Sequence, residues 1–204
     1  MTEISFGATF KSKTRVKKWV SNQYISEKGS IVKADHSDLP AITKTVHLWK
    51  RPYAAQIEQT LEMAEKNPEY KKEVYVLTSQ LDQFEKLAPK KILGMVSVRR
   101  GMYENLVEYL QIRPDIEVRD RTTLDRIKDS ILNFLDIPSS SPRAYKGVGG
   151  NIIKFLQRTL SDKPMTLAAA NTSEAFYKQF GFIPEKYPHN ELMTWTPPNL
   201  KKKN

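Results

Sequence analysis

The sequence predicts an α/β (α+β) fold in which helices flank one mixed, mostly antiparallel sheet of six to seven strands. The first observation behind this class is that short apolar runs alternate with longer stretches whose apolar residues recur every three or four positions. The second is a strand at Asn105–Ile112, followed by a helix at Asn151–Leu160 and another strand at Met165–Ala170. A strand, a helix and a strand in that order form a right-handed crossover, which makes the two strands parallel neighbours.

The first part of the chain predicts an arm, a strand and two helices. Few apolar positions are periodic before residue 31, so we expect a basic, partly ordered arm over 1–30. A first strand should follow at Ile31–Ala34. One helix should end at Trp49, and a second should run over Pro52–Lys66. The main domain would therefore span 31–198.

Three further strands and one insertion complete the predicted domain. Strands are expected at Glu73–Ser79, at Lys91–Arg99 and, last in the chain, at Glu191–Thr196. The stretch 115–142 interrupts the path from the central strand to the helix that follows it. Apolar residues at helical spacing predict a helix within this insertion at 122–135.

Composition excludes several kinds of chemistry. The 204 residues include no Cys, which rules out disulfides and thiolate catalysis. The three histidines, His36, His47 and His189, lie far apart in the sequence, and we expect no metal. Every apolar run is shorter than the ~20 residues that a membrane helix needs. We therefore expect a cytoplasmic protein without a membrane partner.

The net charge of +10 permits attraction to phosphates of a cofactor, a nucleic acid or a membrane. Much of the excess lies at the two ends, in Lys11–Lys18 and in a basic C-terminal tail at 199–204. We interpret both charge runs as solvated tails, as terminal runs of this kind usually are. The sequence thus argues against a nucleic-acid partner without excluding one.

The most informative stretch is a glycine-rich loop at Ala144–Gly150, which leads directly into the apolar helix. Glycine lets the backbone adopt positive φ, and it lets a ligand approach without meeting a Cβ atom. The first N–H groups of the helix have no partner inside it, and they suit a phosphate or pyrophosphate. Lys146 adds a mobile positive charge. A tight turn without a ligand is the structural alternative.

A second segment downstream makes the pattern more specific. The strand at Met165–Ala170 is followed by a capped helix over Asn171–Phe182 that ends at a glycine. Loop, helix, strand, Asn, helix, Tyr and Gly-Phe in this order resemble the GNAT N-acetyltransferase superfamily, whose Arg/Gln-x-x-Gly-x-Gly/Ala loop holds acetyl-CoA. The resemblance covers about Lys91 to Trp195. It implies acetyl-CoA as co-substrate and a parallel strand pair that splays where this cofactor enters.

The resemblance also implies which residues form the site. Tyr177 would be the acid that protonates the departing thiolate, and Glu108 would be the base for the amine, directly or through water. The structural alternatives are a packed aromatic ring for the first and an ion pair with a lysine for the second. Ala144 stands where the family has Arg or Gln, and neighbouring Arg143 could replace it. The residues implied to contact the cofactor are Leu110, Gln111, Ile112, Arg143, Tyr145, Lys146, Gly147, Val148, Gly149, Gly150, Asn151 and Asn171.

The expected activity is an N-acetyltransferase that moves the acetyl group of acetyl-CoA to a primary amine by direct attack in a ternary complex. The acceptor would be a small molecule or a protein, and the insertion at 115–142 either shapes its site or extends the surface. Two alternatives stay open. One is acetylation of an amine linked to RNA, and the other is a non-catalytic acyl-CoA-binding protein on the same fold. A homodimer is compatible with the sequence.

Overall fold

The computed structural model describes residues 11–21, 23–79, 86–114, 145–169, 173–185 and 191–201. Within these residues, one sheet of nine strands runs in the order β6-β1-β2-β3-β4-β5-β7-β9-β8. Neighbouring strands are antiparallel except for β5 and β7. The predicted mixed, mostly antiparallel sheet with flanking helices is therefore confirmed, with more strands than the six to seven expected.

The strands are β1 (Lys11–Val20), β2 (Gln23–Ala34), β3 (Lys72–Ser79), β4 (Ile92–Arg100), β5 (Asn105–Ile112), β6 (Tyr145–Lys146), β7 (Met165–Ala168), β8 (Ile183–Pro184) and β9 (Leu192–Trp195). The helices are α1 (Leu39–Trp49), α2 (Pro52–Lys66), α4 (Val148–Thr159) and α5 (Glu174–Lys178), with single turns of 3₁₀-helix at His36–Asp38, Pro68–Tyr70 and Pro89–Lys91. The helices and central strands thus lie close to where the sequence placed them, although α4 begins at Val148 rather than at Asn151. The exception is α5, which is shorter than the predicted helix.

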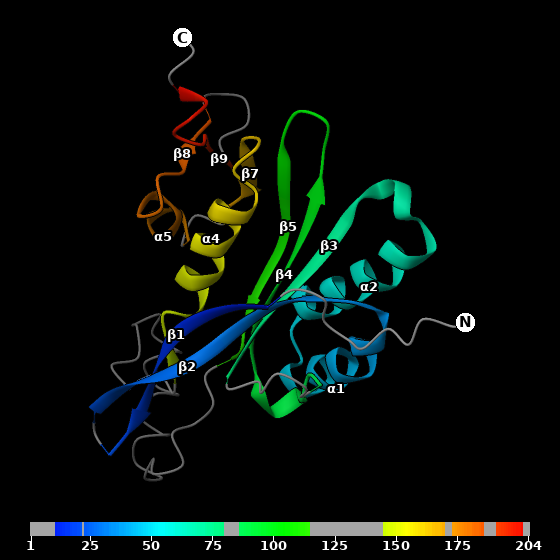
Figure 1. The fold of residues 1–204 in the computed structure, drawn as a ribbon, viewed down its shortest axis with the longest axis vertical. Helices are drawn as coiled ribbons and strands as arrows, with labels where there is room; N and C mark the ends of the chain where they lie inside the picture. The colour runs from blue at the N-terminus through cyan, green and yellow to red at the C-terminus, as the bar shows by residue number, and fades with distance from the viewer. Residues whose placement is uncertain are drawn as a thin grey trace, which may run out of the picture.

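Helices cover both faces of the sheet and create two apolar cores. The helices α1 and α2 pack on one face, and α4 lies on the other (Figure 1). The core beneath α4 contains its buried side chains Ile152, Phe155 and Leu156. The core beneath α1 and α2 contains Ile42 and Ile57. These side chains lie at helical spacing, which is why the apolar stripes predicted the helices correctly.

The interpretation of the charge run Lys11–Lys18 as a solvated tail is wrong. Strand β1 pairs with β2 along its whole length, from Lys11 opposite Val32 to Val20 opposite Gln23. The physical reason is alternation, because the register turns Val16 into the core, where 1% of its surface is exposed. The cations of this run therefore occupy an ordered strand. The first strand of the fold begins twenty residues before Ile31.

The parallel strands separate as the resemblance implies. Strands β5 and β7 pair only from Asn105 to Val107, opposite Met165 to Leu167. Beyond Val107, β5 continues beside β4 as far as Ile112, whereas β7 ends at Ala168. The second half of β5 therefore has one backbone edge with no strand beside it among the described residues. The predicted splay is confirmed.

The insertion at 115–142, with its expected helix at 122–135, lies outside the described residues, as do Arg143 and Asn171. The same holds for residues 1–10 and for residues 202–204 of the predicted C-terminal tail. None of the helices in the described ranges is both long and apolar enough to cross a membrane.

Candidate active site

The glycine-rich loop forms the start of α4. Gly147 adopts φ 81° and ψ 2°, a left-handed conformation that favours glycine, and it stands at the N-cap position without a side-chain hydrogen bond. The backbone N–H of Asn151 donates to the Gly147 carbonyl oxygen at 2.9 Å and closes the first turn. The N–H groups of Val148, Gly149 and Gly150 precede the first intrahelical donor, so they point out of the helix end. This end can bind an anion.

Strand β1 holds the loop in place from one side. Lys17 and Lys18 pair with Lys146 and Tyr145, and this forms the short strand β6. The Asn151 side chain donates from Nδ2 to the carbonyl oxygen of Arg15 at 2.6 Å. The side chain of Asn151 is therefore engaged with β1 rather than turned to the open end of the helix.

Two of the loop glycines are needed for packing. A Cβ atom on Gly149 would lie 2.7 Å from Cδ1 of Ile112 and 3.1 Å from Cζ of Phe176. A Cβ on Gly150 would lie 3.0 Å from Cζ of Phe180. These glycines allow the N-terminus of α4 to approach both β5 and the segment around α5. Gly147, in contrast, is required by its positive φ.

The open end of the splay contains the residues implied to contact the cofactor from β5. Leu110 and Ile112 pack against the core beneath α4, and Ile112 also approaches Gly149. Gln111 donates from Nε2 to the Ile112 carbonyl oxygen at 2.7 Å. The structure therefore brings this end of β5 close to the loop glycines at the open end of the splay.

Arg113 follows β5 directly, and sequence reasoning missed it. Its Nη1 donates to the carbonyl oxygen of Lys90 at 2.7 Å. Burial lowers the pKa of its guanidinium, and the nearby Tyr145 phenol acts in the opposite direction. Arg113 therefore places a partly buried cation near β6, where the family's loop side chain is absent. Its position directly after the strand that the resemblance implies to contact the cofactor was the only signal available.

Tyr177 lies on α5 and packs among aromatic rings. Its ring centroid is 5.1 Å from that of Phe176 and 5.9 Å from that of Phe182. Burial raises the pKa of the Tyr177 phenol, and the phenol of Tyr53 on α2 adds to the increase. Tyr53 also stacks near Tyr109 of β5, with centroids 5.9 Å apart. Tyrosines from α2, β5 and α5 thus meet at the splay, and the sequence had identified only Tyr177.

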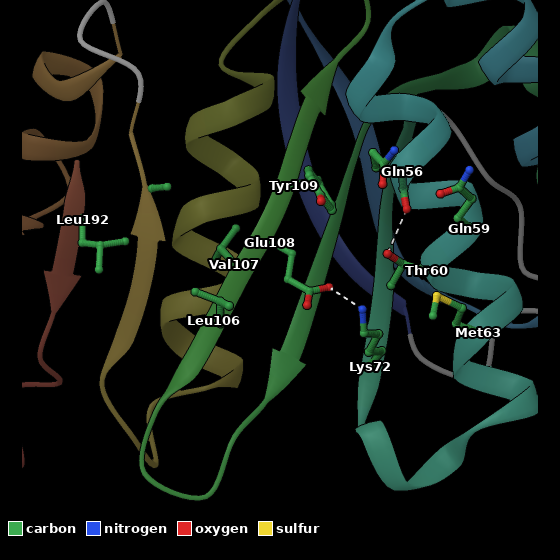
Figure 2. A pocket seen from close by; sticks show the side chains of 11 residues that line it. Gln56, Gln59, Thr60, Met63, Lys72, Leu106, Val107, Glu108, Tyr109 and Leu192 are labelled. Carbon is green, nitrogen blue, oxygen red and sulfur yellow. Dashed lines mark hydrogen bonds and ion pairs between the residues drawn. The ribbon is translucent and has the colours of Figure 1, made fainter. Parts of the chain in front are cut away.

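Glu108 occupies a β-bulge at the level where the parallel strands separate. The register between β4 and β5 shifts so that Val107 faces Val98 and Tyr109 faces Ser97, which leaves Glu108 as the extra residue. The bulge turns the Glu108 side chain toward α2 and Lys72 (Figure 2). No pattern in the sequence predicts this bulge.

The Glu108 carboxylate is paired but not fully satisfied. Its Oε2 lies 3.2 Å from Nζ of Lys72, and its Oε1 lies 3.7 Å from Nε of Arg99. Only 13% of the side chain is exposed. The buried Oε2 nevertheless has no hydrogen-bond donor in the described structure, because the Lys72 contact has ion-pair distance without hydrogen-bond geometry. The ion pair is the structural alternative for Glu108, and the base role stays a prediction.

A pocket of about 380 Å³ adjoins this carboxylate on the α2 side of the sheet. Its walls come from α2 and β5, with Lys72 at the start of β3, Ala168 at the end of β7 and Leu192 at the start of β9 (Figure 2). The lining residues are Gln56, Gln59, Thr60, Met63, Lys72, Leu106, Val107, Glu108, Tyr109, Ala168 and Leu192. Two amides and one buried carboxylate oxygen could therefore bind a donor-rich group beside the open strand edge. Among the described residues, no group of three His, Asp or Glu side chains could hold a metal ion.

No family model matches the chain, and no curated protein matches it in sequence. Solved structures of acetyltransferases do align with it. A Pyrococcus horikoshii protein described as an acetyltransferase is 14% identical over 82% of this chain, with a TM-score of 0.46, and the alignment spans 47% of that protein.

Two other solved structures align along nearly their whole length. The PaiA N-acetyltransferase of Thermoplasma acidophilum, in complex with coenzyme A, is 11% identical, with a TM-score of 0.48 over 82% of this chain and 98% of its own. The spermidine/spermine N-acetyltransferase SpeG of Vibrio cholerae is 12% identical, with a TM-score of 0.42 over 86% and 99%. The splayed parallel pair and the glycine loop before α4 are the features that the resemblance to the GNAT acetyltransferases implies, and both are present in this chain.

Proposed function

We propose that this chain is an N-acetyltransferase that transfers the acetyl group of acetyl-CoA to a primary amine by direct attack in a ternary complex. The observation that carries the proposal is the position of Glu108. Its side chain lines a pocket at the point where β5 and β7 part, and its buried Oε2 has an ion pair with Lys72 but no hydrogen bond within the described residues. The Lys72 ion pair offsets part of the cost of burying this oxygen, and the N–H group of an amine in the pocket would supply the missing hydrogen bond.

The backbone N–H groups at the start of α4 and the free edge of β5 fit acetyl-CoA. The open N–H groups of Val148, Gly149 and Gly150 suit its pyrophosphate, and Arg113 adds a cation near Tyr145. The Lys146 ammonium lies over the Tyr24 ring, 4.2 Å from the ring centroid. The free edge of β5 can form backbone hydrogen bonds with its amide-containing arm. When bound, acetyl-CoA supplies the thioester whose carbonyl carbon accepts the amine.

Tyr177 is the proposed proton donor. Burial raises the pKa of its phenol above the ordinary value of about 10, so the O–H is present near neutral pH. The aromatic contacts with Phe176 and Phe182 restrict the orientation of the ring, so little conformational entropy is lost when its O–H approaches the sulfur. Tyr177 would release its proton to the sulfur as the carbon–sulfur bond breaks.

Glu108 is the proposed acceptor-side group. Its Oε2 would accept a hydrogen bond from the amine and either take the amine's proton or pass it to water. Lys72 and Arg99 hold the carboxylate in position from two sides. Gln56 and Gln59 offer amides on the opposite wall of the pocket, which favours an acceptor with polar groups beyond the amine.

The test is an acetyl-CoA turnover screen against panels of small amines and peptides, read as release of free thiol. Calorimetry with acetyl-CoA runs in parallel on the same protein. Thiol release that depends on an amine would support the proposal. Tight binding of acetyl-CoA without turnover for any amine would favour the non-catalytic acyl-CoA-binding function, and absence of binding would refute both.

A further inference from the structure

The hairpin of β1 and β2 forms a projecting ribbon. Strand β3 pairs with β2 only from Gly29 onward, and β6 pairs with β1 only at Lys17 and Lys18. The remainder of the hairpin, up to its turn after Val20, is two-stranded and extends past the sheet (Figure 1). A two-stranded ribbon of this kind presents a complete side-chain face to solvent.

One face of this ribbon is cationic. Lys13, Arg15 and Lys17 alternate along β1 and share a face, and Lys28 lies directly opposite Arg15. All four side chains are exposed. The stretch 11–28 contains six cations and one acid, so it carries +5 of the chain's net +10. The single acid, Glu27, lies on the other face, where it pairs with Lys18 at 3.6 Å.

The arrangement costs stability unless an anion occupies it. Like charges directly opposite each other in a sheet repel, and Arg15 and Lys28 form such a pair. Within the described residues, neither of them has an ion-pair partner. Ser26 lies opposite Lys17 on the same face and offers an additional hydroxyl donor. Cations with hydroxyl donors between them are typical of surfaces that bind phosphate.

We propose that the cationic face of the β1–β2 hairpin binds the phosphate backbone of double-stranded DNA. Cations two residues apart on a strand are separated by ~6.8 Å, twice the 3.4 Å rise per nucleotide of one DNA strand. A two-stranded β-ribbon also fits the major groove of B-DNA, which is ~12 Å wide, whereas the major groove of duplex RNA is too narrow. This proposal is independent of acetyl transfer.

The experiment measures binding of a fluorescent duplex DNA of roughly 20 base pairs by anisotropy over a series of KCl concentrations. The test variant is Lys13→Thr/Arg15→Thr/Lys28→Thr, which keeps β-compatible side chains. The control variant is Lys44→Gln/Lys66→Gln/Lys154→Gln, which removes an equal number of positive charges from exposed helix positions. Thermal unfolding of both variants checks that the hairpin substitutions leave the fold intact, and single Lys28→Thr serves if the triple variant does not fold.

The expected magnitude follows from counterion release. Each phosphate contact contributes about 0.9 to the slope of log affinity against log salt, which is roughly eightfold in affinity at 0.1 M salt. The triple variant should therefore lose on the order of 10²- to 10³-fold in affinity, and its salt slope should flatten by about 2.7. Lys28→Thr alone should lose about eightfold. The control should keep most of its affinity.

Four results would overturn the proposal. Equal losses in the two triple variants would show that only net charge matters. Tighter binding of duplex RNA or of single strands would refute the ribbon-in-groove geometry. Capture by vesicles rich in phosphatidylserine, without DNA binding, would assign the face to a membrane. A parallel loss of acetyl-CoA affinity in the hairpin variant, without loss of DNA binding, would assign it to the cofactor's phosphates.

Discussion

Replacing Tyr177 by phenylalanine removes one oxygen atom and leaves the ring. The contacts with Phe176 and Phe182 involve the ring alone, so both should survive the substitution. No hydrogen bond of the Tyr177 hydroxyl is recorded within the described residues, and the cost in stability should stay below about 1 kcal/mol. Tyr177→Phe should therefore fold and bind acetyl-CoA as the wild type does.

The loss in rate should be much larger than the loss in stability. A positioned general acid contributes ~10²- to 10⁴-fold, which corresponds to roughly 2.7 to 5.4 kcal/mol of activation free energy. If Tyr177 protonates the departing sulfur, Tyr177→Phe should lower kcat by that factor and leave the acetyl-CoA dissociation constant within about twofold.

The assay is thiol release at saturating acetyl-CoA with the best amine from the screen. Tyr53→Phe is the matched control, because its phenol lies beside that of Tyr177 but comes from α2. A loss below about threefold in Tyr177→Phe, or an equal loss in both variants, would refute the acid role.

Three further predictions concern the carboxylate, the loop and alkaline stability. Glu108→Gln should slow turnover mainly below the pH at which the acceptor amine deprotonates by itself, and a pH–rate profile measures this. A profile that overlays the wild type's, or an equal effect of Lys72→Gln, would show that Glu108 has a structural role and is not the base. Gly147→Ala should lower the free energy of unfolding by about 1 to 2 kcal/mol and weaken acetyl-CoA binding. The cause is the backbone φ of 81°, which an alanine adopts only with strain, because the new Cβ would make no contact closer than ordinary van der Waals distance. Unchanged affinity in calorimetry would show that the loop does not bind acetyl-CoA. Burial raises the pKa values of Tyr75 and Tyr177 above the unfolded value of about 10, so the free energy of unfolding should stay level below pH 10 and fall above it. In denaturant titrations, the free energy of unfolding of Tyr75→Phe should fall less steeply above pH 10 than that of the wild type. An equally steep fall would show that the buried Tyr75 phenol is not its cause.

The sequence predicted the elements whose apolar residues are periodic. The bounds of β5 and of α2 match the expectation residue for residue, because each buries a regular set of side chains. Strand β1 was missed because its one residue in the described core, Val16, lies among cations that resemble a solvated tail. Its place in the sheet depends on pairing with β2, and no local pattern encodes that pairing.

The site was predictable in part for the same reason. The loop glycines and Tyr177 belong to a linear motif, so their residue types alone made them candidates. The pairing of Glu108 with Lys72 arises from a bulge between β4 and β5, which depends on the register of two strands. The sequence also could not predict that Gly149 is needed for packing, because its close approach to Ile112 exists only in the folded chain.

The most direct test of the account is a crystal structure of the protein with bound CoA. We expect the pyrophosphate on the N–H groups of Val148, Gly149 and Gly150, and the arm along the free edge of β5. The sulfur should then lie within hydrogen-bond reach of the Tyr177 hydroxyl, on the order of 3.5 Å, with the Glu108 pocket open beside it. CoA bound on another element, or a sulfur directed away from Tyr177, would contradict the proposed function.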